Sequence, residues 1–185
     1  MKLHIITPVS RPWNLVAIGQ SIAQCIKKME VCWHCAIDKG CKATKPDFPF
    51  LTTFVDGPKS FFGNQLRNLL LDVVQDGWVY FLDDDNILHE NFENAILNAI
   101  ERNPNANWFC FIQIRRDGRV YLNPTDSPQV GTIDMGQVVI RRSFINDLRF
   151  PENSYAADGE LFISLSKFEK PVIIREIATY YNYLR

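Results

Sequence analysis

The chain has 185 residues, of which 46% are hydrophobic and 22% charged, and its formal net charge is −1 at pH 7. These proportions are those of an ordinary soluble globular protein, and the length suits one domain with a sizeable core. The near-neutral charge offers no electrostatic footprint for nucleic acid. No apolar run approaches the roughly 20 residues that span a bilayer. The start, MKLHIITPV, breaks at Pro8 and is too short for a signal peptide, so we expect a strand there and a cytoplasmic protein.

Strands and helices alternate in the first hundred residues. The helices are predicted where apolar residues recur at a period of 3.6, and the strands where short apolar runs end in turn residues. In chain order we expect a strand at 2–7, a helix at 14–29, strands at 31–38 and 51–55, a helix at 64–75, a strand at 78–82 and a helix at 90–103.

The second half has a different character. We expect a hairpin, in which a strand at 108–116 turns at Asp117-Gly118 into a strand at 119–122. A polar loop at 123–136, a strand at 137–141, a helix at 159–168 and one or two strands within 172–184 follow. The order of elements predicts a three-layer α/β/α sandwich with a mostly parallel central sheet.

The five cysteines include a CxxC pair, Cys32 and Cys35, with Cys41 nearby. Such a pair can bind zinc or carry redox chemistry. This pair lies in a predicted strand, where residues three apart point to opposite faces and cannot close one metal site. We therefore expect buried or half-buried free thiols.

Three consecutive aspartates, Asp83, Asp84 and Asp85, follow the buried strand in WVYFLDDDN. Neighbouring carboxylates repel one another unless a cation lies among them. In open α/β sheets, ligands bind beyond the carboxyl ends of the strands, where these residues fall. In an extended chain Asp83 and Asp85 share one side and Asp84 faces away. The alternative is that these aspartates only cap the following turn.

Oxygen-only surroundings favour a hard cation, Mg²⁺ or Mn²⁺. Carboxylates hold such ions together with substrate phosphates, so the expected ligand is a nucleoside diphosphate or a similar compound. His89 lies close in sequence, and we interpret it as a surface residue at the start of a helix.

Four segments in series, ITPVSRP, AIDKG, FFGNQLRN and YFLDDDN, resemble the GT-A glycosyltransferases and are most similar to glycosyltransferase family 2. The resemblance covers about residues 3–100, with fainter similarity through 131–185. It implies one GT-A domain over 1–185, with a nucleotide-binding half at 1–100 and an acceptor half at 101–185.

The resemblance also implies roles in the first half. Asp38 would hydrogen-bond the base, expected to be uracil, and Arg67 would lie near the base or the diphosphate. Asp83 would contact the ribose or a metal-bound water, and Asp85 would ligate Mn²⁺ or Mg²⁺. The remaining residues implied for the nucleotide pocket are Thr7, Pro8, Ser10, Arg11, Asn68 and Asp84.

In the second half, Asp134, Met135 and Gly136 match the family segment beside the donor sugar. Asp158 and Glu160 are the candidates for the general base, and the residues leave the choice between them open. Asp158 also suits the N-cap of the following helix. The implied reaction transfers a sugar from a UDP-sugar to an acceptor hydroxyl with inversion.

Two other classes remain open. A phosphohydrolase of the haloacid-dehalogenase type also places D-x-D after an apolar strand, and a nucleotide-sugar binding module would keep the same aspartates without turnover. The sequence names neither the sugar nor the acceptor, and it does not indicate an oligomeric state.

Overall fold

The structure, a computed structural model, describes residues 1–185, and it contains nine strands and five α-helices. The strands are β1 (Lys2–Val9), β2 (Glu30–Ile37), β3 (Leu51–Asp56), β4 (Trp78–Phe81), β5 (Ile87–Leu88), β6 (Trp108–Arg115), β7 (Val120–Leu122), β8 (Val138–Arg141) and β9 (Val172–Tyr181). The helices are α1 (Leu15–Cys25), α2 (Asn64–Val73), α3 (Phe92–Arg102), α4 (Arg142–Ile145) and α5 (Ala157–Ser166), with 3-10 turns η1 (Pro12–Asn14) and η2 (Met135–Gln137).

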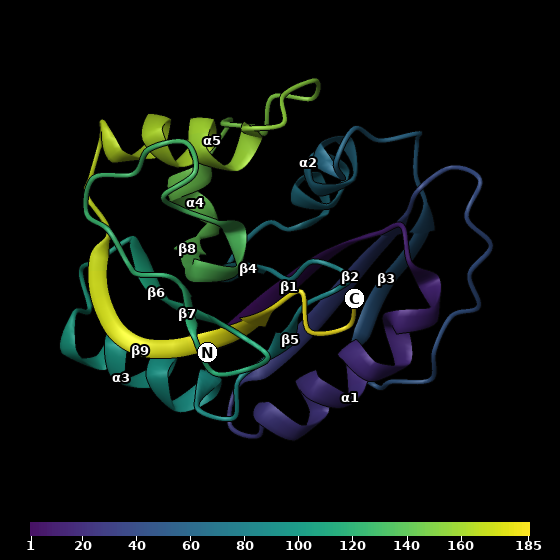
Figure 1. The fold of residues 1–185 in the computed structure, drawn as a ribbon, viewed down its shortest axis with the longest axis horizontal. Coiled ribbons are helices and arrows are strands. Elements are labelled where there is room, and N and C mark those ends of the chain that lie inside the picture. The colour runs from purple at the N-terminus through teal and green to yellow at the C-terminus, as the bar shows by residue number, and fades with distance from the viewer.

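One sheet joins the two halves of the chain, with strand order β3-β2-β1-β4-β8-β6-β9-β5 and β7 paired to β6 (Figure 1). Strands β3, β2, β1 and β4 are parallel, but β8 is antiparallel to both β4 and β6. The prediction of a mostly parallel sheet was wrong, because the sheet is mixed. A parallel pairing needs a long crossover, usually helical, and no α-helix separates β6, β7 and β8.

Each face of the sheet has its own hydrophobic core. Helices α1 and α3 cover one face, and α2, α4 and α5 cover the other (Figure 1). Alternation along β1 sends Leu3 and Ile5 into the first core and Ile6 into the second. The two cores fix the directions of the strands, so the loops at the carboxyl ends of β1, β2 and β4 lie on one rigid edge.

Most predicted elements are present, with shifted ends. Helix α1 ends at Cys25, four residues before the predicted end, because Ile26 is already extended. The short elements β5 and α4 were not predicted. All five cysteines are free thiols, and Cys35 is buried. No helix combines the length and apolar character that crossing a membrane requires.

A buried pair of histidines links the first three strands of the sheet. His4 and His34 stack with ring centroids 5.1 Å apart, and Nδ1 of His4 lies 2.9 Å from Nε2 of His34. Nδ1 of His34 lies 2.8 Å from Oγ1 of Thr53. Burial lowers the pKa of both rings, that of His34 to about 4. The charged neighbours of His4 are Lys2, Asp76 and Glu30.

This pair predicts a loss of stability in mild acid. Between about pH 6.5, the ordinary pKa of histidine, and pH 4, the unfolded chain binds more protons than the folded chain, so stability falls as pH falls. The His34 shift corresponds to at most about 3 kcal/mol. The free energy of unfolding, measured with urea, should therefore differ less between pH 7.5 and pH 5 in the variant His34→Gln than in the wild type. Equal pH dependence in the variant and the wild type would contradict this assignment.

Candidate functional site

A cavity of about 450 Å³ lies at the carboxyl ends of the parallel strands. It is bounded by the loop after β1, by Asp38 after β2, and by the three aspartates after β4. Residues around the start of α2, from Ser60 to Arg67, form another side. The second half contributes Tyr121, Leu122, Val130, Gly131, Ile133, Asp134, Met135, residues 155–158, Tyr181, Asn182 and Arg185. The cavity therefore lies where open α/β sheets bind ligands.

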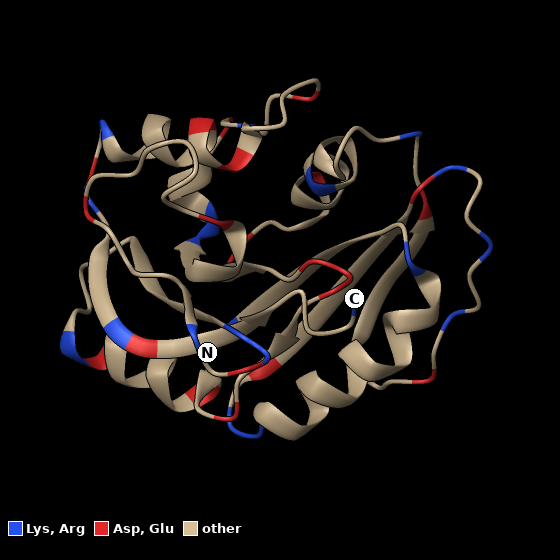
Figure 2. Cartoon of the chain, viewed as in Figure 1, with Lys and Arg blue, Asp and Glu red and all other residues tan.

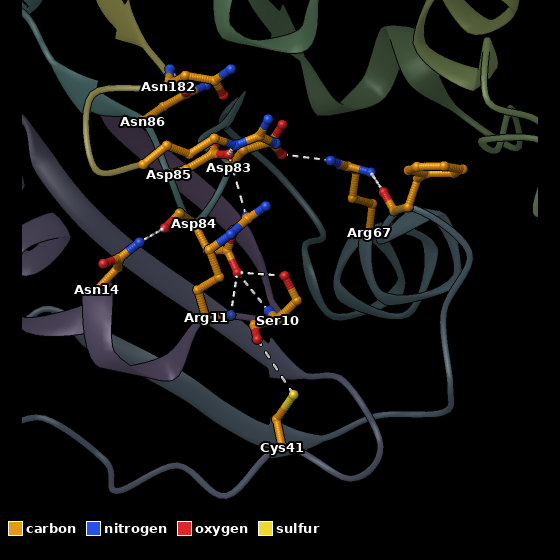
Figure 3. Close-up of polar contacts among 12 residues, drawn as sticks. Ser10, Arg11, Asn14, Cys41, Arg67, Asp83, Asp84, Asp85, Asn86 and Asn182 are labelled. Atoms are coloured by element: carbon orange, nitrogen blue, oxygen red, sulfur yellow. Dashed lines mark hydrogen bonds and ion pairs between the residues drawn. The ribbon is translucent and has the colours of Figure 1, made fainter.

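Asp84 points away from its two neighbours and braces the loop after β1 (Figure 3). Its Oδ2 accepts hydrogen bonds from the backbone N–H groups of Ser10 and Arg11, both at 2.6 Å, and from Oγ of Ser10 at 2.9 Å. Its Oδ1 pairs with the Arg11 guanidinium, and its carbonyl accepts from Asn14. Asp84 is buried, so its charge is satisfied by protein groups.

Asp83 faces the cavity and pairs through Oδ1 with the Arg67 guanidinium. Arg67 is buried and also donates to the carbonyl of Phe62 at 2.6 Å and to Oδ1 of Asn64 at 3.2 Å. These bonds hold the guanidinium at the start of α2. Gly63 precedes that helix with φ +79°, and a Cβ there would come within 2.9 Å of the Pro8 ring.

Asp85 is held by two arginines, one of which sequence reasoning missed. Nε of Arg185 donates to its Oδ2 at 2.7 Å, and Arg11 lies 3.3 Å from the same oxygen. The N–H of Leu184 donates to the carbonyl of Asp85. Burial, together with the nearby charge of Asp83, raises the pKa of Asp85. No spacing in the sequence links residues a hundred positions apart, so Arg185 could not be found from pattern.

The turn at η2 carries Asp134 and Met135 into the cavity lining. Oδ1 of Asp134 accepts from the N–H of Gly136 at 2.8 Å, and the Gly136 carbonyl accepts from Tyr80 and Thr179. A Cβ on Gly136 would lie 2.2 Å from Nε2 of the buried Gln113, so any larger residue there would force the Gln113 side chain to move. Burial, with the charges of Asp83 and Asp158, raises the pKa of Asp134 to about 7.

The two acids of α5 have different surroundings. Asp158 lines the cavity, and burial, with the charge of Asp83, raises its pKa. Glu160 does not line the cavity, and its Oε1 accepts from Oγ of Ser154 at 2.5 Å. The prediction of Asp158 as N-cap was wrong, because α5 begins at Ala157 and its N-cap, Ala156, makes no side-chain bond.

Other expected site residues differ in their access to the cavity. Oγ1 of Thr7 is buried and accepts from Nε1 of Trp33, and Asn68 exchanges two hydrogen bonds with the backbone of Phe150. Neither residue lines the cavity. Asp38 does, and its Oδ1 is buried without a hydrogen bond, 3.4 Å from Nζ of the exposed Lys59. Asp38 can therefore accept a further hydrogen bond.

The donor set fits a divalent cation only if a ligand completes it. No group of three or more His, Cys, Asp or Glu side chains is arranged to hold a metal ion. The bonds of Asp83 use Oδ1 and those of Asp85 use Oδ2, which leaves one oxygen of each carboxylate free. Mg²⁺ is commonly held by one or two carboxylates with substrate phosphates, which matches this pair.

The charge of the lining supports the same fit. Six aspartates and three arginines line the cavity, so carboxylates outnumber cations. Figure 2 shows two acidic segments, namely the loop after β4, which lies beside the C-terminus, and the start of α5. The raised pKa values of Asp85, Asp134 and Asp158 reflect burial together with this excess of negative charge.

The chain has a GT-A glycosyltransferase fold. It is similar to S. aureus TarS 1–349, with a TM-score of 0.74, 18% identity, and coverage of 97% of this chain and 60% of TarS 1–349. The TarS 1–349 complex with UDP-GlcNAc gives a TM-score of 0.73 at 18% identity and covers 98% and 58%. The mannosyltransferase PcManGT of Pyrobaculum calidifontis, in complex with GDP-Man and Mn²⁺, gives 0.67 at 10% identity and covers 95% and 55%.

The chain thus spans about 60% or less of the length of these proteins. No protein-family model matches the sequence, and no curated protein sequence matches it significantly. At these identities the similarity establishes the fold, and the activity has to be argued from the site.

Asp84 is predicted to act in folding stability. Asp84→Ala should lower the free energy of unfolding by about 1–3 kcal/mol, because it removes the buried carboxylate that accepts from the part-buried backbone N–H groups of Ser10 and Arg11. Asp72→Ala, whose carboxylate is 62% exposed in its pair with Arg149, should cost clearly less. Urea unfolding of both variants measures the difference. Equal losses would mean that Asp84 does not brace the loop.

Proposed function

We propose that the protein is a metal-dependent glycosyltransferase that moves a sugar from a nucleotide-sugar, specifically a UDP-sugar, to an acceptor hydroxyl with inversion. The observation that carries the proposal is the pair of free carboxylate oxygens on Asp83 and Asp85, within a cavity in which carboxylates outnumber cations. The similar proteins bind UDP-GlcNAc, or GDP-Man with Mn²⁺, which supports the donor class.

In this proposal the nucleotide binds to the first half of the chain, residues 1–100. The free oxygen of Asp38 accepts the N3–H of uracil, a donor that the ring of adenine lacks. Pro8 and Gly63 border the same part of the cavity and permit close approach of the base. Thr7 and Asn68 act behind the cavity wall, through the bonds that hold β2 and the Phe150 segment in place.

Asp83 and Asp85 would hold Mn²⁺ or Mg²⁺ together with the donor diphosphate. When bound, the ion supplies positive charge that offsets the charge developing on the leaving diphosphate. The protein's own cations on this side are already engaged, Arg67 with Asp83 and Arg185 with Asp85.

In this proposal residues 101–185 bind the acceptor. Asp158 takes the proton of the acceptor hydroxyl as the oxygen bonds to the anomeric carbon and the bond from that carbon to the diphosphate oxygen breaks on the opposite side. A raised pKa makes the carboxylate a stronger base than an ordinary aspartate. Asp134 and Met135 form the wall beside the donor sugar, Gly136 does not line the cavity and supports them from behind, and Glu160 holds Ser154.

The metal role gives the first prediction of this proposal. Asp85→Asn keeps the shape of the side chain but removes its charge. Loss of a group that only supports a metal ligand weakens metal binding about 10–100-fold, and loss of a ligand should cost at least as much in UDP affinity with Mn²⁺. Calorimetric titration of UDP, with Mn²⁺ and with EDTA, measures this effect. Glu101→Gln, an exposed acid on α3, is the matched control. If Asp85→Asn retains the wild-type response to Mn²⁺, Asp85 does not hold the ion.

The base gives a second prediction. Asp158→Asn should bind UDP with Mn²⁺ normally and lose about 10²–10⁴-fold in turnover, the usual contribution of a general base. Glu160→Gln should keep most of its turnover. The measurement is UDP release from a panel of UDP-sugars with candidate acceptors.

Reversal of the two results would make Glu160 the base. Two fully active variants would contradict the proposed mechanism. UDP-sugar binding by the wild type without any UDP release would favour a binding module.

A further inference from the structure

Two aromatic rings stand at the opening of the cavity. Phe62 and Tyr155 both line it, yet their side chains are 57% and 80% exposed. Their centroids lie 4.8 Å apart, with the rings at 78° in an edge-to-face pair. Phe62 precedes α2 and Tyr155 precedes α5, so the pair joins the two halves of the chain across the opening.

The backbone of Phe62 is held in an unfavourable conformation. Its φ of +50° is rare for a bulky residue and is energetically unfavourable. The carbonyl of Phe62 accepts a hydrogen bond from the buried Arg67, which also pairs with Asp83. The ring is therefore kept exposed by contacts with the centre of the site, and no packing of the ring in the core explains the conformation.

The backbone around Tyr155 is fixed on both sides. The Ser154 carbonyl accepts from Nδ2 of Asn64 at 2.9 Å, which ties this segment to the start of α2. Oγ of Ser154 accepts from the N–H of Ala156 at 3.1 Å and donates to Glu160. Tyr155 thus presents an exposed ring from an ordered backbone, so little ordering entropy remains to be lost when a ligand binds.

We propose that Phe62 and Tyr155 form an acceptor subsite that stacks against the C–H face of an uncharged sugar ring. The proposal rests on the proposed function and names the class of acceptor. A sugar ring has an apolar C–H face and hydroxyl edges. The negative face of an aromatic ring attracts C–H groups, and carboxylates such as Asp158 accept from hydroxyls.

The charge of the cavity selects against acidic acceptors. Six aspartates line it, and the three arginines among the lining residues are each paired with one of them. The arginines that line the cavity are therefore already engaged and are not available to a uronate or a phosphate. An uncharged sugar avoids this repulsion.

The test is saturation-transfer NMR with the methyl glycosides of glucose, galactose, mannose, N-acetylglucosamine and glucuronic acid, each in the presence of UDP and Mn²⁺. We expect the wild type to saturate C–H protons of at least one neutral glycoside and to give no stronger signal with the glucuronide. Tyr155→Ala should weaken the binding of that glycoside at least about tenfold, whereas Tyr155→Phe should keep it. Phe168→Ala removes an equally exposed ring at the far end of α5 and should have no effect.

Calorimetric titration of UDP, with no glycoside present, separates the subsite from the donor site. Equal UDP affinity in Tyr155→Ala and the wild type supports the acceptor assignment. Loss of UDP affinity in Tyr155→Ala would assign the rings to the nucleobase and overturn it. The acceptor assignment would also be overturned if the wild type bound no glycoside, or if Tyr155→Ala bound the glycoside as tightly as the wild type. Failure of the proposed function would differ, because UDP itself would then fail to bind the wild type.

Discussion

The structure depends on how the charges of three adjacent aspartates are balanced. Asp84 is buried and satisfied by the loop after β1, whereas Asp83 and Asp85 face the cavity and are paired with Arg67 and Arg185. The expectation of an extended chain was wrong here: Asp84 and Asp85 lie in a turn that the N–H of Asn86 closes by donating to the Asp83 carbonyl. This turn, rather than strand alternation, directs the middle carboxylate away from its two neighbours. The middle aspartate thereby joins the ends of β1 and β4. Of the two others, Asp83 is partly exposed to the cavity, whereas Asp85 is buried under Arg11 and Arg185.

The same division explains how two halves of different architecture make one cavity. The parallel strands β1, β2 and β4 place their carboxyl ends along one side of the cavity. The opposite wall consists of loop segments of the second half, around residues 130–135 and 155–158, and hydrogen bonds from other elements hold these segments in place. Tyr80 of β4 and Thr179 of β9 both donate to the Gly136 carbonyl, and Asn64 of α2 donates to the carbonyls of Pro151 and Ser154. Buried hydrogen bonds of this kind are costly to break, since each leaves an unpaired polar group. The wall segments are therefore positioned by Tyr80 and Asn64 of the first half together with Thr179 of the second.

The sequence was informative where structure is local. Hydrophobic period and turn residues located most strands and helices, and the run from Val79 to Leu82 into three aspartates located the cavity. Properties that depend on distant residues were not accessible. The antiparallel placement of β8 between β4 and β6, the pairing of Arg185 with Asp85, and the true start of α5 before Asp158 are all decided by tertiary packing. The N-cap was the alternative role predicted for Asp158, because aspartate is common at that position, but α5 begins at Ala157, two residues before the predicted start, so Asp158 lies in its first turn.

Asp134 adds a constraint on how the site can operate. Its pKa near 7, raised first by burial and then by Asp83 and Asp158, couples it to groups on both sides of the cavity. Under the proposed function, a cation held by Asp83 and Asp85 would weaken the repulsion that Asp83 exerts on Asp134 and Asp158, and both carboxylates would ionise more readily. In that proposal Asp158 must be ionised to take the acceptor proton, so holding the cation would favour the form of Asp158 that can act as base. The excess of carboxylates in the lining is the feature of this chain that would couple the two proposed roles.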